Sequence, residues 1–279
     1  MVILDGKTLA NKIKEDIKNR IESLNKRPKL SIILVGDDFA SHKYVEMKKK
    51  ACEEVGIICE VYPYAKETKE QIVINKINEL NSDPSVNGIM VQLPLPKGFS
   101  RENIVEKILP DKDVDGLTTV NFSKITNNDN QAYIPATPKG IMTLLKEYNI
   151  NVKGKNVVII NDSFQIGKPL KEMMLGQGAI VNICNKETPD ISVFTKEADI
   201  LVVATGVINL ITADIVKDGG TIIDVGINKN SEGKTVGDVD FENVSKKVEY
   251  ITPVPGGIGP MTIASLLDNV VIAYGRQNT

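Results

Sequence analysis

Short apolar runs alternate with amphipathic segments along the first half of the chain. The runs KLSIILVG, IICEVYP and GIMVQLP have the length of strands, and between them apolar residues recur at helical spacing. Strands that are almost continuously apolar are typical of a parallel sheet covered on both faces. This half is therefore predicted to be an α/β unit. Its helices are expected over 7–24, 41–55 and 69–81.

The alternation resumes after an irregular, turn-rich region over 111–138, which is the expected junction between two domains. The helices expected beyond it cover 138–148, a segment beginning near Gly167, and 263–274. The strands expected in this half are NVVIIN, AIVNIC, ILVVAT, TIIDVG and VEYIT. This pattern predicts a second α/β unit, of Rossmann type.

Length and charge narrow the class of protein. The chain has 279 residues, enough for two modest domains, and its formal net charge is −2 with acidic and basic residues interspersed. Proteins that bind nucleic acid usually carry a strong basic field, so nucleic acid is not an expected partner. No apolar run reaches the ~18 residues that a membrane span needs. No targeting signal is evident, and a membrane is not an expected partner.

The cysteines and the histidine do not indicate a metal site or a disulfide framework. Cys52, Cys59 and Cys184 lack the close pairing of zinc ligands, and His42 is the single histidine. Free cysteines fit a reducing compartment. We therefore expect a cytoplasmic protein that needs no metal ion.

Lys48 lies on the apolar side of its expected helix, for which Ser41 is the expected N-cap. At about 100° per residue it falls on one narrow stripe with Tyr44, Ala51 and Val55. Such a lysine either extends its ammonium to the solvent or lines a polar cavity. In a cavity its pKa falls and its proton becomes usable in catalysis. The pattern alone leaves both alternatives open.

Two segments of the first half place polar groups next to apolar strands. Gln92 ends a strand, where open α/β sheets bind ligands, although a glutamine can also tie down a loop. The segment DKDVDG offers the carboxylates of Asp113 and Asp115 just before Gly116. That spacing also suits a simple turn.

Two segments of the second half have an unusual composition. The loop over 252–262 combines three prolines with three glycines, which encodes one stiff path and favours a ligand-binding wall over a plain turn. The strand NVVIIN leads into a turn and helix where backbone N–H groups could bind a phosphate. However, the G-x-G-x-x-G fingerprint is absent and Asp162 would repel a phosphate. Lys186 could compensate for this charge or could be simply solvated.

Taken together, the motifs resemble the family of bifunctional methylenetetrahydrofolate dehydrogenase/methenyltetrahydrofolate cyclohydrolase. The similarity covers essentially the whole chain and rests on LDGKTLA, YVEMK, VQLPLP, DKDVDG, ATPKGIM, GKP, DVGIN and TPVPGGIGPMT. It implies two α/β domains with a cleft between them. These would be a folate-binding catalytic domain over 1–138 plus 262–279 and an NAD(P)-binding Rossmann-type domain over 139–261. It also implies tetrahydrofolate derivatives as ligands, a homodimer, and a role in one-carbon metabolism and purine biosynthesis.

The resemblance also assigns roles to single residues. Lys48 matches the catalytic lysine and Gln92 the amide that hydrogen-bonds it. Tyr44 matches the aromatic residue that stacks on the folate, and Asp115 the carboxylate that accepts hydrogen bonds from the pterin ring. Further expected folate contacts are Val91, Leu93, Pro255, Gly256, Gly257, Ile258 and Gly259. Expected cofactor contacts are Asn161, Asp162, Ser163, Gly167, Lys186 and Ile227.

The implied chemistry is oxidation of 5,10-methylenetetrahydrofolate with NADP, followed by hydrolysis of the methenyl product to 10-formyltetrahydrofolate. The chain departs from the family pattern at the nucleotide turn, where Asn161 and Asp162 replace glycine and a non-acidic residue. Since Asp162 disfavours a 2′-phosphate, NAD is possible in place of NADP. Two alternatives stay open. One is a cyclohydrolase with weak or NAD-dependent dehydrogenase activity, and the other is a non-catalytic folate-binding protein, against which the lysine–glutamine pair argues.

Overall fold

The computed structural model describes residues 1–278, which form two compact units. Unit 1 contains Met1–Asn11, Ile125–Asp129 and Thr137–Thr262, and unit 2 contains Lys12–Lys124, Asn130–Ala136 and the residues from Ile263 onward. Each unit combines a parallel sheet with helices, so the predicted α/β class is confirmed. Helices α1 (Gly6–Glu22) and α10 (Ile258–Gln277) each contribute residues to both units.

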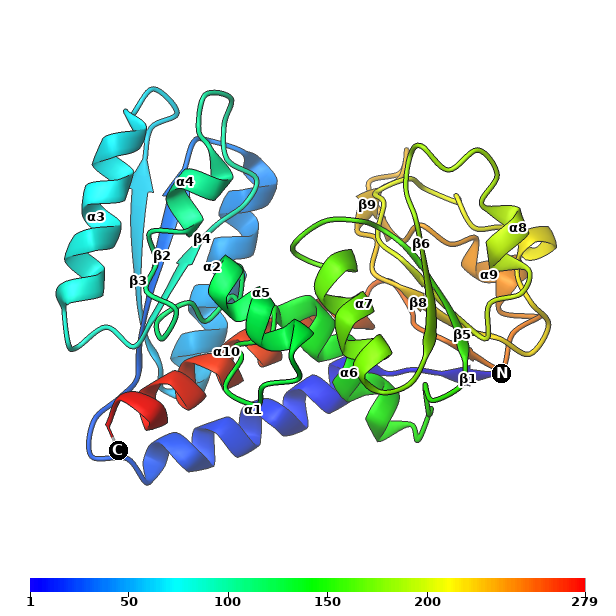
Figure 1. The fold of residues 1–279 in the computed structure, drawn as a ribbon, viewed down its shortest axis with the longest axis horizontal. Helices are drawn as coiled ribbons and strands as arrows, with labels where there is room; N and C mark the ends of the chain where they lie inside the picture. Colours follow the sequence, from blue (N-terminus) through cyan, green and yellow to red (C-terminus); the bar gives the residue numbers. More distant parts are fainter. Residues whose placement is uncertain (279) are drawn as a thin grey trace. The chain divides into compact units, whose positions relative to one another are not determined.

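Unit 2 is built on a parallel sheet with the strand order β3-β2-β4 (Figure 1). Its strands are β2 (Lys29–Val35), β3 (Ile58–Tyr64) and β4 (Gly88–Val91). Helices α2 (Phe39–Val55) and α3 (Glu70–Ser82) cover opposite faces. Ile32 and Leu34 of β2 enter the apolar cluster on the α2 side, and Ile33 and Val35 enter the cluster on the α3 side. Burial on both faces explains why these strands are almost continuously apolar.

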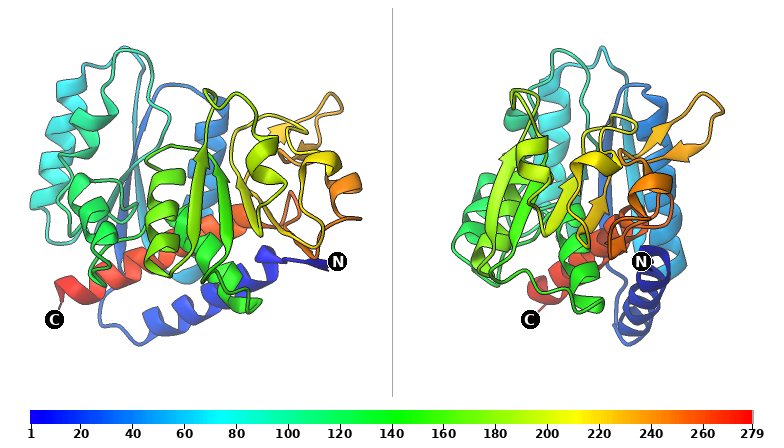
Figure 2. Two further views of the ribbon diagram at one scale, coloured as in Figure 1. Left: turned by 45° about the vertical axis from the view of Figure 1, so that its right-hand side comes forward. Right: turned by 90° about the vertical axis from the view of Figure 1, so that its right-hand side faces the viewer.

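Unit 1 contains a parallel sheet with the strand order β1-β11-β8-β7-β5-β6. Its strands are β1 (Val2–Ile3), β5 (Asn156–Ile160), β6 (Ile180–Cys184), β7 (Ile200–Val203), β8 (Thr221–Asp224) and β11 (Tyr250–Ile251). After β5, the chain adds β6 on one side of it and then returns to add β7 on the other side, so the strand order reverses between β5 and β7. Ligands of open α/β sheets bind at the carboxyl ends of the strands at such a point. Strands β9 (Asn228–Lys229) and β10 (Thr235–Val236) form a hairpin that stands out from the unit (Figure 2).

Short helices complete the described chain. They are α4 (Arg101–Val105), α5 (Thr119–Thr126), α6 (Ala136–Glu147), α7 (Gly167–Gly176), α8 (Ser192–Thr195), the 3-10 helix η1 (Ala213–Ile215) and α9 (Phe241–Val244). α5 lies in the region expected to be irregular, and α10 begins at Ile258 instead of 263. Pro260 lies in the first turn of α10, where a missing N–H is tolerated, so the proline did not mark the end of the loop.

The first residues of the chain lie in unit 1, although the sequence pattern grouped them with the first domain. Val2 pairs with Tyr250 and Ile3 with Ile251, which adds β1 to the edge of the larger sheet. A strand of two residues shows no periodicity, and its partner lies at the other end of the sequence. The pattern of apolar residues therefore gave no sign of this pairing.

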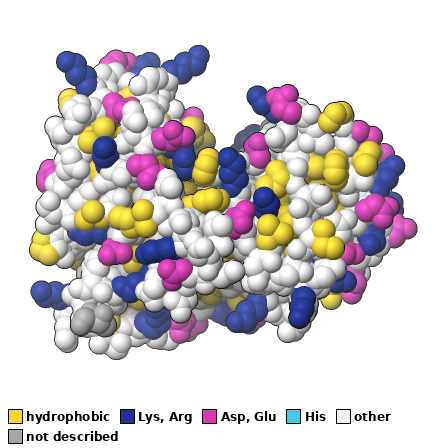
Figure 3. Space-filling model, in the orientation of Figure 1, with side chains coloured by type: hydrophobic (Ala, Val, Ile, Leu, Met, Phe, Trp, Pro, Cys, Tyr) yellow, Lys and Arg dark blue, Asp and Glu magenta, His cyan; other side chains and the backbone are white. Residues whose placement is uncertain are grey.

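α10 has the length and composition of a membrane span, but 56% of its most apolar window is buried inside the protein. Leu266, Leu267 and Val270 belong to the apolar cluster on the α2 side of unit 2. This burial is typical of the core helix of a globular protein. On the face shown in Figure 3, acidic and basic side chains are interspersed, in agreement with the small net charge.

A buried carboxylate organises the DKDVDG segment and the start of α5. Asp113 is 1% exposed and accepts hydrogen bonds from the backbone N–H groups of Leu117 (3.1 Å) and Thr118 (2.9 Å). It also accepts one from the side-chain amide of Asn121 (2.8 Å), whose oxygen accepts the backbone N–H of Tyr133 (3.2 Å). The turn that the sequence allowed for this segment is therefore formed around Asp113, which leaves Asp115 available for another role.

We expect Asp113→Ala to lower the free energy of unfolding by about 2–4 kcal/mol, because buried donors lose a charged acceptor. The control is Asp111→Ala, since Asp111 is exposed. Urea unfolding of both variants, followed by circular dichroism, measures the difference. Equal stability of the two variants would contradict the organising role of Asp113.

Candidate active site

Helix α2 carries Lys48 into the interior of unit 2. The helix begins after Asp38, whose carboxylate accepts a hydrogen bond from the backbone N–H of Ser41 (2.8 Å). It ends at Gly56, which has φ +91. The N-cap predicted at Ser41 is wrong, because the helix starts earlier, at Phe39, and the preceding aspartate supplies the cap.

The apolar stripe predicted for this helix is confirmed. Ala51 and Val55 are buried, and Tyr44 and Lys48 are partly buried. The charged residues on the other faces are all exposed, namely Lys43, Glu46, Lys49, Lys50, Glu53 and Glu54. The Lys48 Nζ donates a hydrogen bond to Gln92 Oε1 at 2.9 Å. The ammonium is therefore directed into the unit and does not extend to the solvent.

Gln92 is fixed by its own hydrogen bonds. It is 8% exposed, its backbone N–H donates to the carbonyl of Ile33 (2.8 Å), and its side-chain NH2 donates to the carbonyl of Leu93 (2.6 Å). With the NH2 group used in this way, the amide oxygen is left to accept from Lys48. The side chain that ties down the loop after β4 thus also orients the lysine.

Burial changes the protonation of Lys48 and Asp115 in opposite directions. Burial lowers the pKa of Lys48, and the nearby Asp115 carboxylate partly opposes that shift. Burial raises the pKa of Asp115 to about 6, although the nearby Lys48 ammonium acts against the change. A lysine with a lowered pKa beside a carboxyl with a raised pKa is an arrangement suited to proton transfer near neutral pH.

Tyr44 lies one helical turn before Lys48 on the same stripe. It is partly buried, and burial raises the pKa of its phenol. The hydroxyl therefore stays protonated at neutral pH, and the ring can offer an aromatic face to a flat ligand.

Val91 and Leu93 lie beside Gln92 but face the opposite way. Both belong to the apolar cluster on the α3 side, whereas Met90 belongs to the cluster on the α2 side. The alternation of a strand produces this division. Gln92 is thus the member of the VQL segment whose side chain reaches Lys48, and the other two have only backbone groups to offer on that side.

In unit 1 the segment between β11 and α10 is held against the N-terminal residues. Gly256 has φ +110, and its carbonyl accepts a hydrogen bond from the backbone N–H of Lys7 (2.8 Å). A Cβ placed on Gly6 would lie 2.0 Å from the carbonyl oxygen of Gly257, so two backbones meet in direct contact. Pro255 lies in this stiff loop, whereas Ile258, 2% exposed, and Gly259 already form the first turn of α10.

The turn after β5 is built by an asparagine side chain instead of by glycines. Asn161 Oδ1 accepts hydrogen bonds from the backbone N–H groups of Ser163 (3.0 Å) and Gly167 (3.0 Å) and from Ser163 Oγ (2.7 Å). Its Nδ2 donates to the carbonyl of Ala204 after β7 (2.7 Å). Asn161 therefore joins the two strand ends at the point where the strand order reverses. A Cβ on Gly167 would lie 1.8 Å from the Asn161 carbonyl oxygen, so only glycine fits there.

The remaining expected cofactor residues lie at the rim of unit 1. Asp162 is exposed, and its carboxylate accepts a hydrogen bond from the side-chain amide of Asn185 (2.9 Å). The side chain of Lys186 is 90% exposed and lies 3.8 Å from Glu187. Ile227, after β8, is 49% exposed. Within Met1–Asn278 no group of three or more histidine, cysteine, aspartate or glutamate side chains could hold a metal ion.

The sequence interpretation missed the loop after β7. Asp238, which is fully buried, accepts hydrogen bonds from the backbone N–H groups of Thr205 (2.6 Å) and Gly206 (3.0 Å). This loop lies at the carboxyl end of the strand beside β5 and is joined to the Asn161 turn. The apolar run ILVVAT followed by a glycine was the available signal, but the partner carboxylate lies more than thirty residues away in sequence.

Comparison with known proteins agrees with this geometry. The family model for the tetrahydrofolate dehydrogenase/cyclohydrolase catalytic domain matches residues 4–115, and the model for the NAD(P)-binding domain of the same family matches residues 135–278. A bifunctional protein FolD from Hydrogenobaculum sp. is 50% identical over 278 residues, covering 99% of this chain and 100% of the relative.

Solved structures give the same result. The bifunctional FolD methylenetetrahydrofolate dehydrogenase/cyclohydrolase from Campylobacter jejuni matches with a TM-score of 0.96 and 47% identity, covering 99% of both chains. The Trypanosoma brucei enzyme, solved in complex with NADP cofactor and an inhibitor, matches with a TM-score of 0.94 and 30% identity, covering 99% of this chain and 97% of that one. The resemblance inferred from the motifs is confirmed, and the chain belongs to the tetrahydrofolate dehydrogenase/cyclohydrolase family.

Proposed function

We propose that this chain oxidises 5,10-methylenetetrahydrofolate to 5,10-methenyltetrahydrofolate with NADP and then hydrolyses that product to 10-formyltetrahydrofolate, with Lys48 as the catalytic group. Membership of a bifunctional enzyme family supports the two reactions of one-carbon metabolism. The observation that carries the catalytic assignment is the inward-directed Lys48 ammonium, hydrogen-bonded to Gln92 at 2.9 Å, with the charge of Asp115 acting on it.

The hydrolytic step requires a water molecule and two proton transfers. Water attacks the methenyl carbon, and neutral Lys48 accepts one of its protons. The bond from that carbon to N5 then breaks, Lys48 returns its proton to N5, and the hydroxyl proton leaves to solvent as the formyl group forms. Burial lowers the pKa of Lys48, which favours the neutral amine that acts as the base, and Gln92 holds the side chain in position.

Other side chains of unit 2 would orient the folate. We assign Tyr44 to stacking on the flat ring system, in which aromatic contact contributes on the order of 1 kcal/mol beyond buried area. In its ionised form, Asp115 would accept hydrogen bonds from the pterin. Val91 and Leu93 would contribute backbone groups, because their side chains enter the α3-side cluster. In unit 1, the stiff segment Pro255, Gly256, Gly257, Ile258 and Gly259 is the second proposed folate-contacting element.

The end of β5 suits a dinucleotide. Gly167 lets the start of α7 approach the strand end closely, and the strand order reverses at this place. NADP, when bound, supplies the nicotinamide ring that accepts the hydride. We assign Ser163 and Gly167 to the turn that the cofactor approaches and Ile227 to an apolar contact. Asn161 holds that turn, since its Oδ1 accepts the Ser163 and Gly167 N–H groups and its Nδ2 donates to Ala204.

The choice between NADP and NAD depends on Asp162 and Lys186. A carboxylate held beside Asn185 would repel a 2′-phosphate, and the extended Lys186 side chain can attract it. The structure of the Trypanosoma brucei relative with NADP supports NADP as the first choice. A cyclohydrolase with a weak or NAD-dependent dehydrogenase is the second candidate, and Asp162 is the observation that favours it.

The remaining features of the proposal follow from the family. We propose a cytoplasmic homodimer whose partners are tetrahydrofolate derivatives, with neither nucleic acid nor membrane involved. Its product, a formyl donor, suits purine biosynthesis. A folate-binding protein without catalysis is a weaker alternative, because mere binding does not require a lysine whose ammonium is oriented by a fixed amide.

We expect Lys48→Met to lower the rate of methenyl hydrolysis by roughly 10²–10⁴-fold, which is the contribution of general acid–base catalysis. Dehydrogenase activity should persist, because hydride transfer needs little proton transfer. Lys50→Met is the matched control, since Lys50 is an exposed lysine of the same helix. Decay of methenyltetrahydrofolate absorbance gives the rate, and an unchanged rate in Lys48→Met would remove the catalytic assignment.

The pH dependence of the dehydrogenase activity should reflect the ionisation of Asp115. Its pKa is raised from 3.8 to about 6, so the carboxylate form prevails above pH 6 and is lost as the pH falls through 6. We expect kcat/KM for methylenetetrahydrofolate to fall below pH 6, mainly through KM, because the protonated acid loses one acceptor for the pterin. In the Asp115→Asn variant, this fall of kcat/KM below pH 6 should be absent. If kcat/KM of the variant still fell below pH 6 as in the parent, a group other than Asp115 would cause the fall.

Asp162→Asn should raise the ratio of kcat/KM with NADP to kcat/KM with NAD by roughly fivefold, since two like charges ~4 Å apart in water repel by about 1 kcal/mol. The substitution removes charge and keeps the size of the side chain. Glu197→Gln, at an exposed carboxylate elsewhere in unit 1, is the control. Formation of reduced cofactor with each dinucleotide at equal concentration measures the ratio, and a constant ratio would show that Asp162 does not select the cofactor.

A further inference from the structure

Asp238 is a buried carboxylate that lies where two loops of unit 1 meet. It is 0% exposed and follows the hairpin of β9 and β10 in the chain. Its Oδ2 atom accepts hydrogen bonds from the backbone N–H of Thr205 (2.6 Å), from the Thr205 hydroxyl (2.9 Å) and from the backbone N–H of Gly206 (3.0 Å). These three donors belong to the loop after β7. The carboxylate therefore holds the backbone of that loop in one conformation.

The other oxygen of Asp238 contacts the loop after β8. Asp238 Oδ1 accepts a hydrogen bond from the side-chain amide of Asn228 (2.8 Å). A Cβ on Gly226 would lie 2.1 Å from the same oxygen, so the carboxylate lies directly against the backbone of this loop. One side chain thus joins the loops that follow two neighbouring parallel strands, at their carboxyl ends.

A second buried carboxylate fixes the position of the first. Asp224 is the last residue of β8 and is 3% exposed. It accepts hydrogen bonds from the backbone N–H groups of Gly226 (2.9 Å), Asp238 (3.0 Å) and Val239 (3.0 Å). Its own backbone N–H donates to the hydroxyl of Thr252, the residue after β11 (2.7 Å). Asp224 therefore ties the backbone of Asp238 to the end of β8.

The two loops that Asp238 joins expose apolar side chains. Val207 is 51% exposed, Ile208 40% and Ile227 49%. Ile227 Cδ1 lies 3.7 Å from the position that a Cβ on Gly259 would take, so it adjoins the segment of unit 1 proposed to contact the folate. In the sheet, β7 and β8 lie between β5 and β11, whereas the residues proposed to select the 2′-phosphate follow β5 and β6. The apolar rim is therefore at the end of the cofactor site where hydride transfer would occur.

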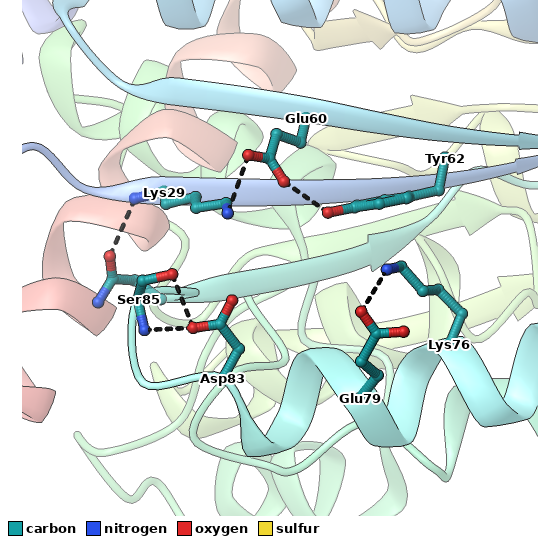
Figure 4. Close-up of polar contacts among 8 residues, drawn as sticks. Lys29, Glu60, Tyr62, Lys76, Glu79, Asp83 and Ser85 are labelled. Carbon is teal, nitrogen blue, oxygen red and sulfur yellow. Dashed lines mark hydrogen bonds and ion pairs between the residues drawn. The ribbon is translucent and has the colours of Figure 1, made fainter.

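Polar contacts in unit 2 show how the Asp238 cluster differs from an ordinary surface network (Figure 4). Glu60 of β3 accepts a hydrogen bond from Tyr62 of the same strand and forms an ion pair with Lys29 of β2 (2.9 Å). The Glu60 side chain is 42% exposed, and exposed pairs of this kind contribute little to stability. Asp238 is instead enclosed, and its removal would leave the donors of two loops without an acceptor.

We propose that Asp238 is a positioning residue for the dehydrogenase reaction, which holds the loops after β7 and β8 so that their apolar rim binds the nicotinamide half of the dinucleotide. Both of its oxygens accept hydrogen bonds within the protein, so it acts through the loops and not by contact with the cofactor. This inference rests on the proposed dehydrogenase activity. It does not concern the choice between NADP and NAD, because the nicotinamide half is common to both.

We expect Asp238→Asn to raise the KM for NADP and the KM for NAD by roughly tenfold each, because an amide places donors against the donors that the carboxylate accepts. The ratio of the two KM values should stay constant, and kcat at saturating dinucleotide should change less than KM. Methenyl hydrolysis without cofactor should be unchanged, because Lys48 lies in unit 2. Initial rates of cofactor reduction and of methenyl hydrolysis measure these quantities.

Asp199→Asn is the matched control for a purely structural effect. Asp199 lies just before β7, at the opposite edge of the same sheet. It accepts hydrogen bonds from the backbone N–H of Asn156 (2.9 Å) and from Lys217 Nζ (2.8 Å). Its substitution should lower the temperature of thermal unfolding and leave the KM for both dinucleotides unchanged.

Thr205→Val is the milder test, and it decides the question if Asp238→Asn does not fold. It removes the hydroxyl that donates to Asp238 and accepts the backbone N–H of Val207, and it keeps the backbone donors in place. The KM for both dinucleotides should rise by roughly threefold, since fewer hydrogen bonds are lost.

Unchanged KM values in Asp238→Asn and Thr205→Val would overturn the proposal, as would an equal rise in Asp199→Asn or a loss of hydrolysis as large as the loss of dehydrogenation. Should the parent reduce neither dinucleotide, the proposed dehydrogenase fails separately. Binding of NADPH, followed by the fluorescence of its nicotinamide ring, then decides whether Asp238→Asn weakens the site. A parent that binds no NADPH would overturn both proposals.

Discussion

The burial of one positive charge is the constraint on which unit 2 depends. An ammonium taken out of water without partners costs several kcal/mol, so the groups around Lys48 must offset the loss of hydration. The Gln92 oxygen supplies a hydrogen bond, and Asp115 supplies the opposite charge. Their positions depend in turn on the alternation of β4 and on the hydrogen bonds of Asp113. The site and the fold of this unit are therefore held by the same interactions.

Much of this could be predicted from the sequence, since it depends on local periodicity. The apolar runs predicted the strands of both sheets except β1, and the stripe containing Tyr44 and Lys48 predicted that the lysine lies on the apolar side of its helix. The alternatives left open at Lys48 and Gln92 could not be decided in this way. They depend on which atoms of distant segments meet, and a one-dimensional pattern does not contain the 2.9 Å contact between α2 and the end of β4.

The features that escaped prediction share one physical cause, namely pairing between segments far apart in the chain. Asp113 uses its carboxylate within its own segment, but Asn121 links that segment to Tyr133, and Asn161 links the ends of β5 and β7. Asp113 and Asn121 are buried and Asn161 is partly buried, and each satisfies several polar groups at once. In sequence, such a residue looks like an ordinary turn former. The missing glycine fingerprint after β5 thus reflects a turn built by a side-chain amide.

The pairing of β1 with β11 has a consequence for how the protein is made. The first strand to leave the ribosome finds its partner only when Tyr250 and Ile251 have been synthesised, and the core of unit 2 also waits for Leu266 and Val270. Unit 1 lacks its last strand until residues 250–251 have been made, and unit 2 lacks part of its core until α10 has been made. During translation the edge of β8 and the α2-side face of the β3-β2-β4 sheet stay exposed until β11 and α10 have been made.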